Sequence, residues 1–191
     1  MRRLLGAILL LPLAALAWGA DADKHNTLTA KEAADGWLLL FDGESTYGWR
    51  SPNDSKWTVA QGMLAPQAGK PGLLVTTTAF TDFEVSLEYR ARRDSRATLL
   101  FGCDRDGKPA APATELVLPH PGGGWCQARL TIHGHRLTSK EISAFGFRNI
   151  TRGATPSDPR PAAGHLALSG NGMIFRDIKL KPLSTKSIFN G

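Results

Sequence analysis

The chain has 191 residues, 42% of them apolar, and a formal net charge of +6. This length suits a single domain that can bury a core. Its Lys and Arg residues are scattered, and no basic run is interleaved with aromatic residues, so we expect no nucleic-acid-binding groove.

Residues 1–22 have the pattern of a secretory signal peptide. Arg2 and Arg3 precede an apolar run (residues 4–18), and small residues follow up to a cleavage site at Ala22. The run is shorter than the roughly 20 residues that span a bilayer as a helix. We therefore expect a secreted or periplasmic chain without a membrane anchor after processing; a retained anchor is the alternative.

Residues 23–35 are expected to form a linker and one short helix. Residues 21–26 are polar and typical of a flexible linker. Thr29 is a candidate N-cap, because Glu32 follows at capping-box spacing and Gly36 ends the segment.

From Gly36 onward the sequence shows short β-rich segments separated by turn residues. The clearest strand is 82–90, where apolar and polar residues alternate, and 125–132 repeats this pattern. Further strands are expected at residues 37–41, 98–103, 115–118, 143–147, 165–169 and 173–181. Loops are expected at residues 104–112, 119–124 and 151–164. Many short strands with turns between them predict an all-β sandwich or jelly roll.

Cys103 and Cys126 both lie in expected strands. An exported chain with two cysteines permits one disulfide between neighbouring or facing strands. The alternative is two separate buried cysteines, which behave as small apolar residues.

Glu84 and Glu88 lie four residues apart on one expected strand face. Their Cα atoms would be about 13 Å apart at roughly 3.3 Å per residue, whereas a retaining glycosidase holds its carboxyl groups ~5 to 5.5 Å apart. A solvated or salt-bridged strand face is therefore favoured over a two-carboxylate glycosidase.

Several segments carry a resemblance to a known family. They are residues 40–43 (Leu-Phe-Asp-Gly) with Gly48 and Trp49, then 57–64, 72–76, 80–90 and 172–183. In this order they resemble the 3-keto-disaccharide hydrolase domain family over residues 36–183. The resemblance implies a concanavalin-like β-sandwich (jelly roll) that binds carbohydrate and cleaves an oxidised disaccharide or glycoside.

The activity that the resemblance implies begins with a ketone at C3 of the sugar. The ketone makes the C2 proton acidic, so a base can remove it, the C1 glycosidic oxygen can leave, and water then adds. An electrophile near the C3 oxygen is also needed. A divalent metal ion would supply it, although the sequence shows no metal motif of its own.

The resemblance also implies site residues. Glu115 matches the Glu of the family's Glu-x-Gln stretch, whose Gln is replaced here by Val117. We expect Glu115 to be a catalytic base or metal ligand; a strand-end carboxylate paired with an arginine is the alternative. Trp125 matches a family Trp and could stack on a sugar ring or pack structurally.

Four further residues are candidates for substrate binding. Ser169 and Asn171 stand where the family has Gln and His. Arg176 matches a family Arg, and it could bind sugar oxygens or hold a carboxylate such as Glu88 within the sandwich. We consider the structural role of Arg176 the favoured one.

Three other features have simpler interpretations. Trp49 and Trp57 are expected to be structural. His133 and His135 could form a metal pair, but a turn with exposed histidines is favoured. Asp104 begins a segment that is read as a turn and not as a calcium loop, because later oxygen ligands are missing.

Two functional hypotheses remain. The first is an exported enzyme that cleaves 3-keto-disaccharides or 3-keto-glucosides. The second is a non-catalytic carbohydrate-binding or interaction module, suggested by the missing polar residues. Residues 184–191 read as a linker or the start of a second copy, so a second similar domain is one expected partner. A separate sugar oxidoreductase is the other, because the activity that the resemblance implies acts on an oxidised sugar.

Overall fold

The computed structural model describes residues 24–67, 72–119, 124–133, 136–144, 147–152 and 163–183. The expected signal peptide and the expected second copy lie outside these residues. The described elements are α1 (Ala30–Ala34), β1 (Leu38–Leu39), β2 (Trp49–Arg50), β3 (Trp57–Ala60), β4 (Met63–Pro66), β5 (Gly72–Phe80), β6 (Phe83–Cys103), β7 (Pro109–Leu118), β8 (Cys126–His133), β9 (Arg136–Ala144), β10 (Phe147–Arg152) and β11 (Gly164–Pro182). In the described part of the chain, no helix has the length and apolar character needed to cross a membrane.

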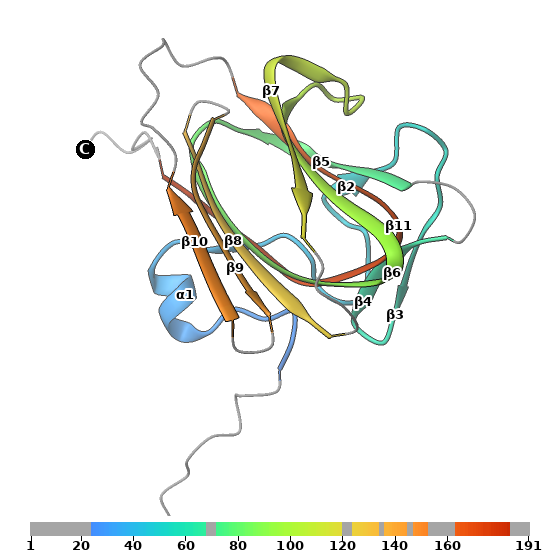
Figure 1. Ribbon diagram of the computed structural model, residues 1–191, viewed down its shortest axis with the longest axis horizontal. Helices are drawn as coiled ribbons and strands as arrows, with labels where there is room; N and C mark the ends of the chain where they lie inside the picture. Colours follow the sequence, from blue (N-terminus) through green and yellow to red (C-terminus); the bar gives the residue numbers. More distant parts are fainter. Residues whose placement is uncertain are drawn as a thin grey trace, which may run out of the picture.

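The strands form one antiparallel sheet that is folded into two layers (Figure 1). The long strands β6 and β11 pair along most of their length and run through both layers. Their register shifts between Asn171 and Met173, at the point where the two layers diverge.

We call the two layers A and B. Layer A contains β10, β9, β8, the first part of β6 and the last part of β11, with β1, β4 and β3 attached. Layer B contains β7, the last part of β6, the first part of β11, β5 and β2.

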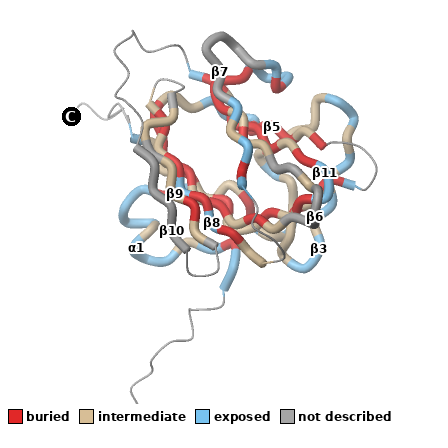
Figure 2. Tube along the Cα trace, in the orientation of Figure 1, coloured by how far each residue is buried: buried red, intermediate tan, exposed pale blue. Residues whose placement is uncertain are grey.

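The core lies between the layers, where Figure 2 shows the buried residues. Alternation in β6 explains this arrangement, because every second side chain points inward. Val85, Leu87 and Tyr89 of layer A and Leu99 and Phe101 of layer B are completely buried in one cluster. Each layer therefore presents one face to the core and one outer face.

Helix α1 begins as the sequence predicts. Thr29 accepts a hydrogen bond from the Glu32 N–H, and the Glu32 carboxylate accepts one from the Thr29 N–H, which completes the capping box. Asp35 caps the other end, and Gly36 follows with a φ of 83°. The helix has no buried residue, and the ion pair of Glu32 with Lys179 of β11 connects it to the sheet.

Several strand boundaries differ from the predicted ones. The expected strands 82–90 and 98–103 are parts of β6, and 165–169 and 173–181 are parts of β11. The expected strand 143–147 is wrong, because β9 ends at Ala144 and β10 begins at Phe147. Only two residues of the expected strand 37–41 are paired, as β1.

The expected loop 104–112 is shorter than predicted, because β7 already begins at Pro109. Two prolines are tolerated in this strand because, among the described strands, β7 pairs with β6 alone. The turn predicted at Asp104 is confirmed: its carboxylate accepts the N–H groups of Asp106 and Lys108.

The two cysteines are free and buried. Cys126 lies in the core between the layers, whereas Cys103 belongs to a small cluster on the other side of layer B. The Cys103 thiol donates to the backbone oxygen of His165. The alternative of two separate buried cysteines is the one that the structure shows.

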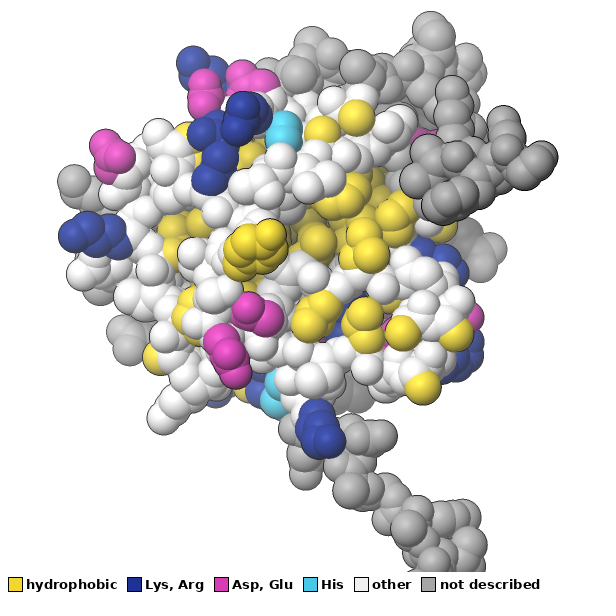
Figure 3. Space-filling model, turned by 180° about the vertical axis from the view of Figure 1, so that it is seen from behind, with side chains coloured by type: hydrophobic (Ala, Val, Ile, Leu, Met, Phe, Trp, Pro, Cys, Tyr) yellow, Lys and Arg dark blue, Asp and Glu magenta, His cyan; other side chains and the backbone are white. Residues whose placement is uncertain are grey.

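The face opposite to the view of Figure 1 has apolar side chains near its middle and interspersed acidic and basic side chains toward its margins (Figure 3). Trp49 is buried in the core, and Trp57 packs against it with its ring 6.2 Å from that of Phe175. Both tryptophans are therefore structural, as predicted.

Candidate functional site

Glu115, the predicted base, lies on the outer face of layer B. Its register partner in β6 is Leu100, whose sequence neighbours Leu99 and Phe101 point into the core. Leu100 and Glu115 therefore face outward, and the Glu115 side chain is exposed. A carboxylate on this face is accessible to a ligand.

The register places Glu115 at the end of a row across four strands. Leu100 of β6 pairs with Ala167 of β11, which pairs with Val75 of β5. Ala167, Val75 and Cys103 are buried in a cluster of their own, with Leu100 packed against it. This row is apolar except for the carboxylate.

Ser169 lies in the neighbouring row of the same outer face. It pairs with Thr98 of β6 and Leu73 of β5, and Thr98 pairs in turn with Val117 of β7. The Val117 side chain is 46% exposed, where the family has an amide. Asn171 is exposed further along β11, close to the point where the layers diverge.

The turn after β6 covers the far end of this face. A Cβ at Gly107 would lie 2.8 Å from Leu73 and 3.0 Å from Val75, and the φ of Gly107 is 73°, so a larger residue would not fit. An ion pair holds the turn in place, with Arg50 Nη2 2.7 Å from Asp106 Oδ1. The accessible part of the face therefore lies toward Glu115 and Val117.

Trp125, Glu88 and Arg176 come together on the outer face of layer A. Arg176 Nε donates to Glu88 Oε2 at 2.8 Å, and its guanidinium carbon lies 3.8 Å from the centre of the Trp125 ring. Arg90 also lies over Trp125, at 5.0 Å. Guanidinium groups thus contact the Trp125 ring, which favours the structural role for Arg176.

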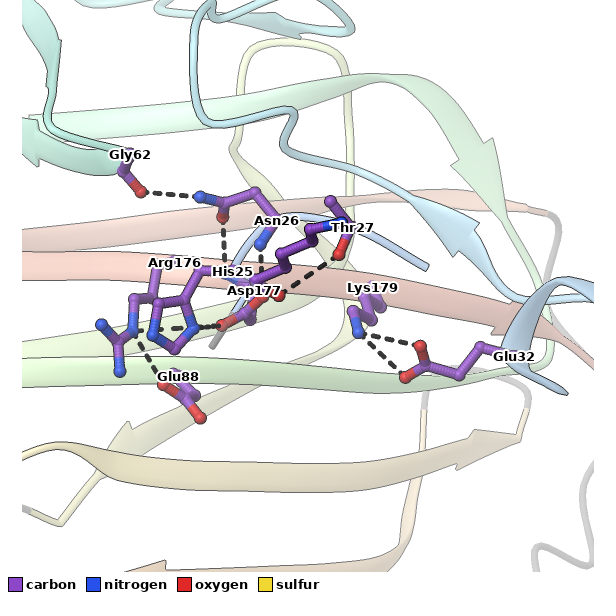
Figure 4. A network of polar contacts seen from close by, with 10 residues as sticks. His25, Asn26, Thr27, Glu32, Gly62, Glu88, Arg176, Asp177 and Lys179 are labelled. Atoms are coloured by element: carbon purple, nitrogen blue, oxygen red, sulfur yellow. Dashed lines mark hydrogen bonds and ion pairs between the residues drawn. The ribbon is translucent and has the colours of Figure 1, made fainter. Parts of the chain in front are cut away.

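The same network continues to the N-terminal segment, as Figure 4 shows. His25 Nδ1 lies 2.6 Å from Asp177 Oδ2, and the Asn26 N–H donates to Asp177 Oδ1. The Asp177 N–H donates back to Asn26 Oδ1 at 2.9 Å. Asn26 and Asp177 both have positive φ, 55° and 50°, so the two residues hold each other in an uncommon conformation.

Asn26 is a buried polar residue that the sequence did not reveal. The expected flexible linker is wrong for His25 and Asn26, because both residues bind Asp177 of β11. The Asn26 amide also donates to the Gly62 backbone oxygen. A Cβ at Gly43 would lie 2.7 Å from Asn26 Nδ2, so this glycine leaves room for the amide. No sequence signal links residues so far apart.

His25, Glu88 and Asp177 are a group of possible metal ligands within the described residues, with donor atoms within 4.8 Å of one another. A metal ion does not fit there, because Arg176 already lies 2.8 Å from Glu88 and 3.9 Å from Asp177. The guanidinium supplies the positive charge that the carboxylates need. Asp177 also accepts the N–H of Asn26, so the group is a closed ion-pair network.

The predicted site residues therefore fall into two sets. Glu115 and Ser169 share the outer face of layer B, with Asn171 at its end. Trp125, Glu88 and Arg176 share the outer face of layer A. The two faces point away from each other, so one ligand cannot contact both sets.

The Glu84 and Glu88 carboxylates are separately paired. Glu84 lies 2.7 Å from Arg129, and Glu88 is held by Arg176. This is the salt-bridged strand face that the sequence favours. His133 lies 3.8 Å from Asp82, and His135 is outside the described residues.

Comparisons with known proteins find similarity to one family over part of this chain. Residues 36–117 match the model of the 3-keto-alpha-glucoside-1,2-lyase-like domain. The 3-keto-disaccharide hydrolase of Bacteroides thetaiotaomicron is 24% identical over 116 residues, which cover 51% of this chain and 40% of that protein. This chain therefore matches less than half the length of that relative.

Solved structures support the fold. A putative glycosyl hydrolase from Parabacteroides distasonis has a TM-score of 0.64 and 18% identity, covering 84% of this chain and 100% of its own. The exoplasmic/lumenal domain of VIP36, in a form bound to Ca²⁺ and Man3GlcNAc, has a TM-score of 0.53 and 11% identity, covering 80% and 90%. The predicted all-β, concanavalin-like sandwich with a short N-terminal helix is confirmed.

Together these matches indicate a carbohydrate-active domain of the glycosyl-hydrolase-like type. The resemblance to the 3-keto-disaccharide hydrolase domain family that the sequence predicts is confirmed, and the matched residues 36–117 carry it.

Proposed function

We propose that this domain cleaves 3-keto glycosides or 3-keto-disaccharides by elimination, with Glu115 as the base. The observation that carries the proposal is the exposed Glu115 carboxylate on the outer face of layer B. Glu115 lies within the part of the chain that matches the family model.

The proposed reaction needs one base and little leaving-group assistance. Glu115 takes the C2 proton, and the electron pair of the C–H bond forms an enolate with the C3 oxygen. The enolate then forms the C1–C2 double bond as the C1–O bond breaks, and the leaving oxygen takes a proton. Water adds to C1 in a second step. A single carboxylate is enough because the C3 ketone has made the C2 proton acidic.

The enolate oxygen needs a hydrogen-bond donor or a positive charge. Thr98 and Ser169 carry hydroxyl groups on the same outer face, in the row next to Glu115. We propose these hydroxyls as donors to the sugar. A divalent metal ion is an alternative source of positive charge, and its addition is one arm of the test.

A two-carboxylate glycosidase is not supported. Glu84 and Glu88 each form an ion pair with an arginine, and they lie on the other layer from Glu115. An elimination, which uses one carboxylate, agrees better with this arrangement than acid and nucleophile catalysis by two.

The test is release of the leaving group from a 3-keto-glucoside, with and without Mn²⁺ or Ca²⁺. Glu115→Gln is expected to lower turnover by about 100-fold or more, the usual contribution of a general base. Glu44→Gln is the matched control, because Glu44 is also exposed but lies on the loop between β1 and β2. Unchanged turnover in Glu115→Gln would remove Glu115 from the mechanism.

The second candidate function is a non-catalytic carbohydrate-binding or interaction module. It is supported by the residues near Glu115 on the outer face of layer B. Leu100, its register partner, is apolar, and in the next row Thr98 is neutral and Val117 exposes 46% of its side chain. An apolar strip on a sheet suits the apolar face of a sugar ring. Saturable binding of a 3-keto-glucoside without turnover in any metal would favour this function over the enzyme.

We also propose that the chain is exported after cleavage near Ala22, and that a separate sugar oxidoreductase supplies its substrate. A C3 ketone must be made by oxidation of a hydroxyl group, and nothing in the proposed elimination does this. Mass spectrometry of the protein from its producing cells tests export: a mature N-terminus near residue 23 is expected, and an intact Met1 would contradict it.

A further inference from the structure

A polar cavity lies between helix α1 and the outer face of layer A. Its volume is about 200 Å³, and its lining is almost wholly polar. The lining residues are Glu32, Ser86, Gln127, Arg129, Glu141 and Ser143. This cavity is not part of the proposed elimination site, which lies on layer B.

The floor of the cavity is built by register. Ser86 of β6 pairs with Arg129 of β8, which pairs with Glu141 of β9. In the neighbouring row, Gln127 of β8 pairs with Ser143 of β9. Side chains at paired positions lie on the same face about 4.5–5.5 Å apart, so these five residues form a continuous polar floor.

Helix α1 supplies the wall through Glu32. The Glu32 carboxylate accepts from Lys179 Nζ at 2.9 and 3.0 Å and from the Thr29 N–H at 2.8 Å. Burial raises the pKa of Glu32, but the hydrogen bonds from Thr29 and Lys179 outweigh it, so the pKa is lowered and the group stays ionised. The wall is therefore fixed in place by its own ion pair.

Three neutral lining groups have no hydrogen-bond partner among the described residues. Within the described part of the chain, no hydrogen bond engages the side chains of Ser86, Gln127 or Ser143. Each of these groups can both donate and accept. They therefore offer both hydrogen-bond donors and hydrogen-bond acceptors to a ligand in the cavity.

The charges at the cavity disfavour an anionic ligand. The lining holds two carboxylates, Glu32 and Glu141, and one guanidinium, Arg129. Arg129 is already paired with Glu84 at 2.7 Å and lies over the Trp37 ring at 5.2 Å. A ligand here meets neutral hydroxyl and amide groups beside carboxylates that outnumber the guanidinium in the lining.

The size limits the ligand further. About 200 Å³ holds roughly six or seven waters at about 30 Å³ each, and it is smaller than the roughly 300–1,000 Å³ of drug-sized pockets. A single sugar ring, with hydroxyl groups around its edge, suits both this size and this lining. We infer that the cavity is a second carbohydrate site, which binds one neutral, unoxidised sugar ring away from Glu115.

The test is an NMR titration of the whole chain with D-glucose, D-glucosamine and D-glucuronate. Glucose is expected to shift the backbone signals of Ser86, Gln127 and Ser143, glucosamine to bind at least as well, and glucuronate to bind more weakly. Because two hydrogen bonds are lost, Ser86→Ala/Ser143→Ala is expected to weaken glucose binding about tenfold. Thr131→Val is the control, since Thr131 lies on β8 outside the lining.

Three results would overturn the inference. They are the absence of shifts at the cavity with any of the three sugars, glucose affinity unchanged in the double variant, and tighter binding of glucuronate than of glucose. Circular dichroism confirms that each variant folds. Glu115→Gln must leave glucose binding unchanged, which separates this site from the proposed enzyme site.

Discussion

The outer faces of layers A and B are built from the same two long strands but carry opposite chemistry. On layer A, the rows across the sheet consist of polar residues, and their charges are paired, as in Arg176 with Glu88 and Arg129 with Glu84. On layer B, the row that contains Glu115 continues through Leu100, Ala167 and Val75.

The proposed base therefore lies on the outer face with fewer charged residues among those described. The ion pairs of layer A satisfy one another, so they contribute to structure and leave only the neutral groups of the cavity for a ligand. The carboxylate of layer B stands among apolar and neutral neighbours across β6.

The largest expected effect tests this contrast with two matched substitutions. Glu88→Ala is expected to lower the free energy of unfolding by about 2 kcal/mol, because Arg176 loses the carboxylate to which it donates at 2.8 Å and keeps only Asp177 at 3.9 Å. Partial exposure keeps the cost below that of a fully buried pair. Glu115→Ala is expected to stay within about 0.5 kcal/mol of the parent. Urea unfolding of both variants measures these changes. An equal loss of stability in the two variants would contradict the difference between the layers.

The next effect concerns the buried end of layer B. Burial raises the pKa of the Cys103 thiol to about 11, from a reference of 9.0. Between these values the folded state keeps a proton that the unfolded state has lost, so stability falls as the pH rises from about 9 to about 11. At pH 10 the loss is about 1.4 kcal/mol.

Urea unfolding at pH 8, 9 and 10 measures this loss, and Cys103→Ala is the comparison. The variant is expected to lose less stability than the parent between pH 8 and pH 10. Burial also raises the pKa of Tyr89, which adds to the loss in both proteins at the highest pH. If the free energy of unfolding fell equally with pH in parent and variant, water would reach the Cys103 thiol in the folded state and its pKa would not be raised.

A smaller effect is expected at the wall of the layer A cavity. Thr29→Ala removes the side-chain half of the capping box and is expected to cost about 1 kcal/mol of stability. Thr27→Ala is the control, because Thr27 is exposed and its hydroxyl donates, within the described residues, to the Lys24 backbone oxygen alone. The thermal unfolding midpoints of both variants report the difference; equal midpoints would mean that the Thr29 cap contributes nothing to stability.

The smallest effect is expected at Val117. Val117→Gln should leave the free energy of unfolding within about 0.5 kcal/mol, because the side chain is 46% exposed. The new amide faces the row of Thr98 and Ser169 and should strengthen binding of a 3-keto-glucoside about fivefold through one hydrogen bond. Calorimetric titration checks this, and unchanged affinity would place the sugar elsewhere.

The sequence predicted the fold where the signal is local. The alternation in residues 82–90 and the Thr29–Glu32 spacing both gave correct elements. Long-range features were missed. Nothing near Gly172 shows that β11 continues through it, because the continuity depends on pairing with β6.

The site was predictable only in part, for the same reason. The family pattern points to Glu115 as the proposed base, and the structural role expected for Arg176, holding a carboxylate such as Glu88, is the one observed. The division of the site residues between two faces was not, since it depends on which layer each strand joins. Asn26 was missed because its partners Gly62 and Asp177 are 36 and 151 residues away.

The pairing of β6 with β11 also has a consequence for how the chain folds. The Arg176–Glu88 contact joins residues 88 positions apart, and the whole β6–β11 ladder is similarly non-local. Closing such a loop costs entropy before any contact repays it, and domains dominated by non-local pairing fold in milliseconds to seconds. Because both layers share these strands, neither can form its complete sheet first, and we expect the two to appear in one cooperative, slow step.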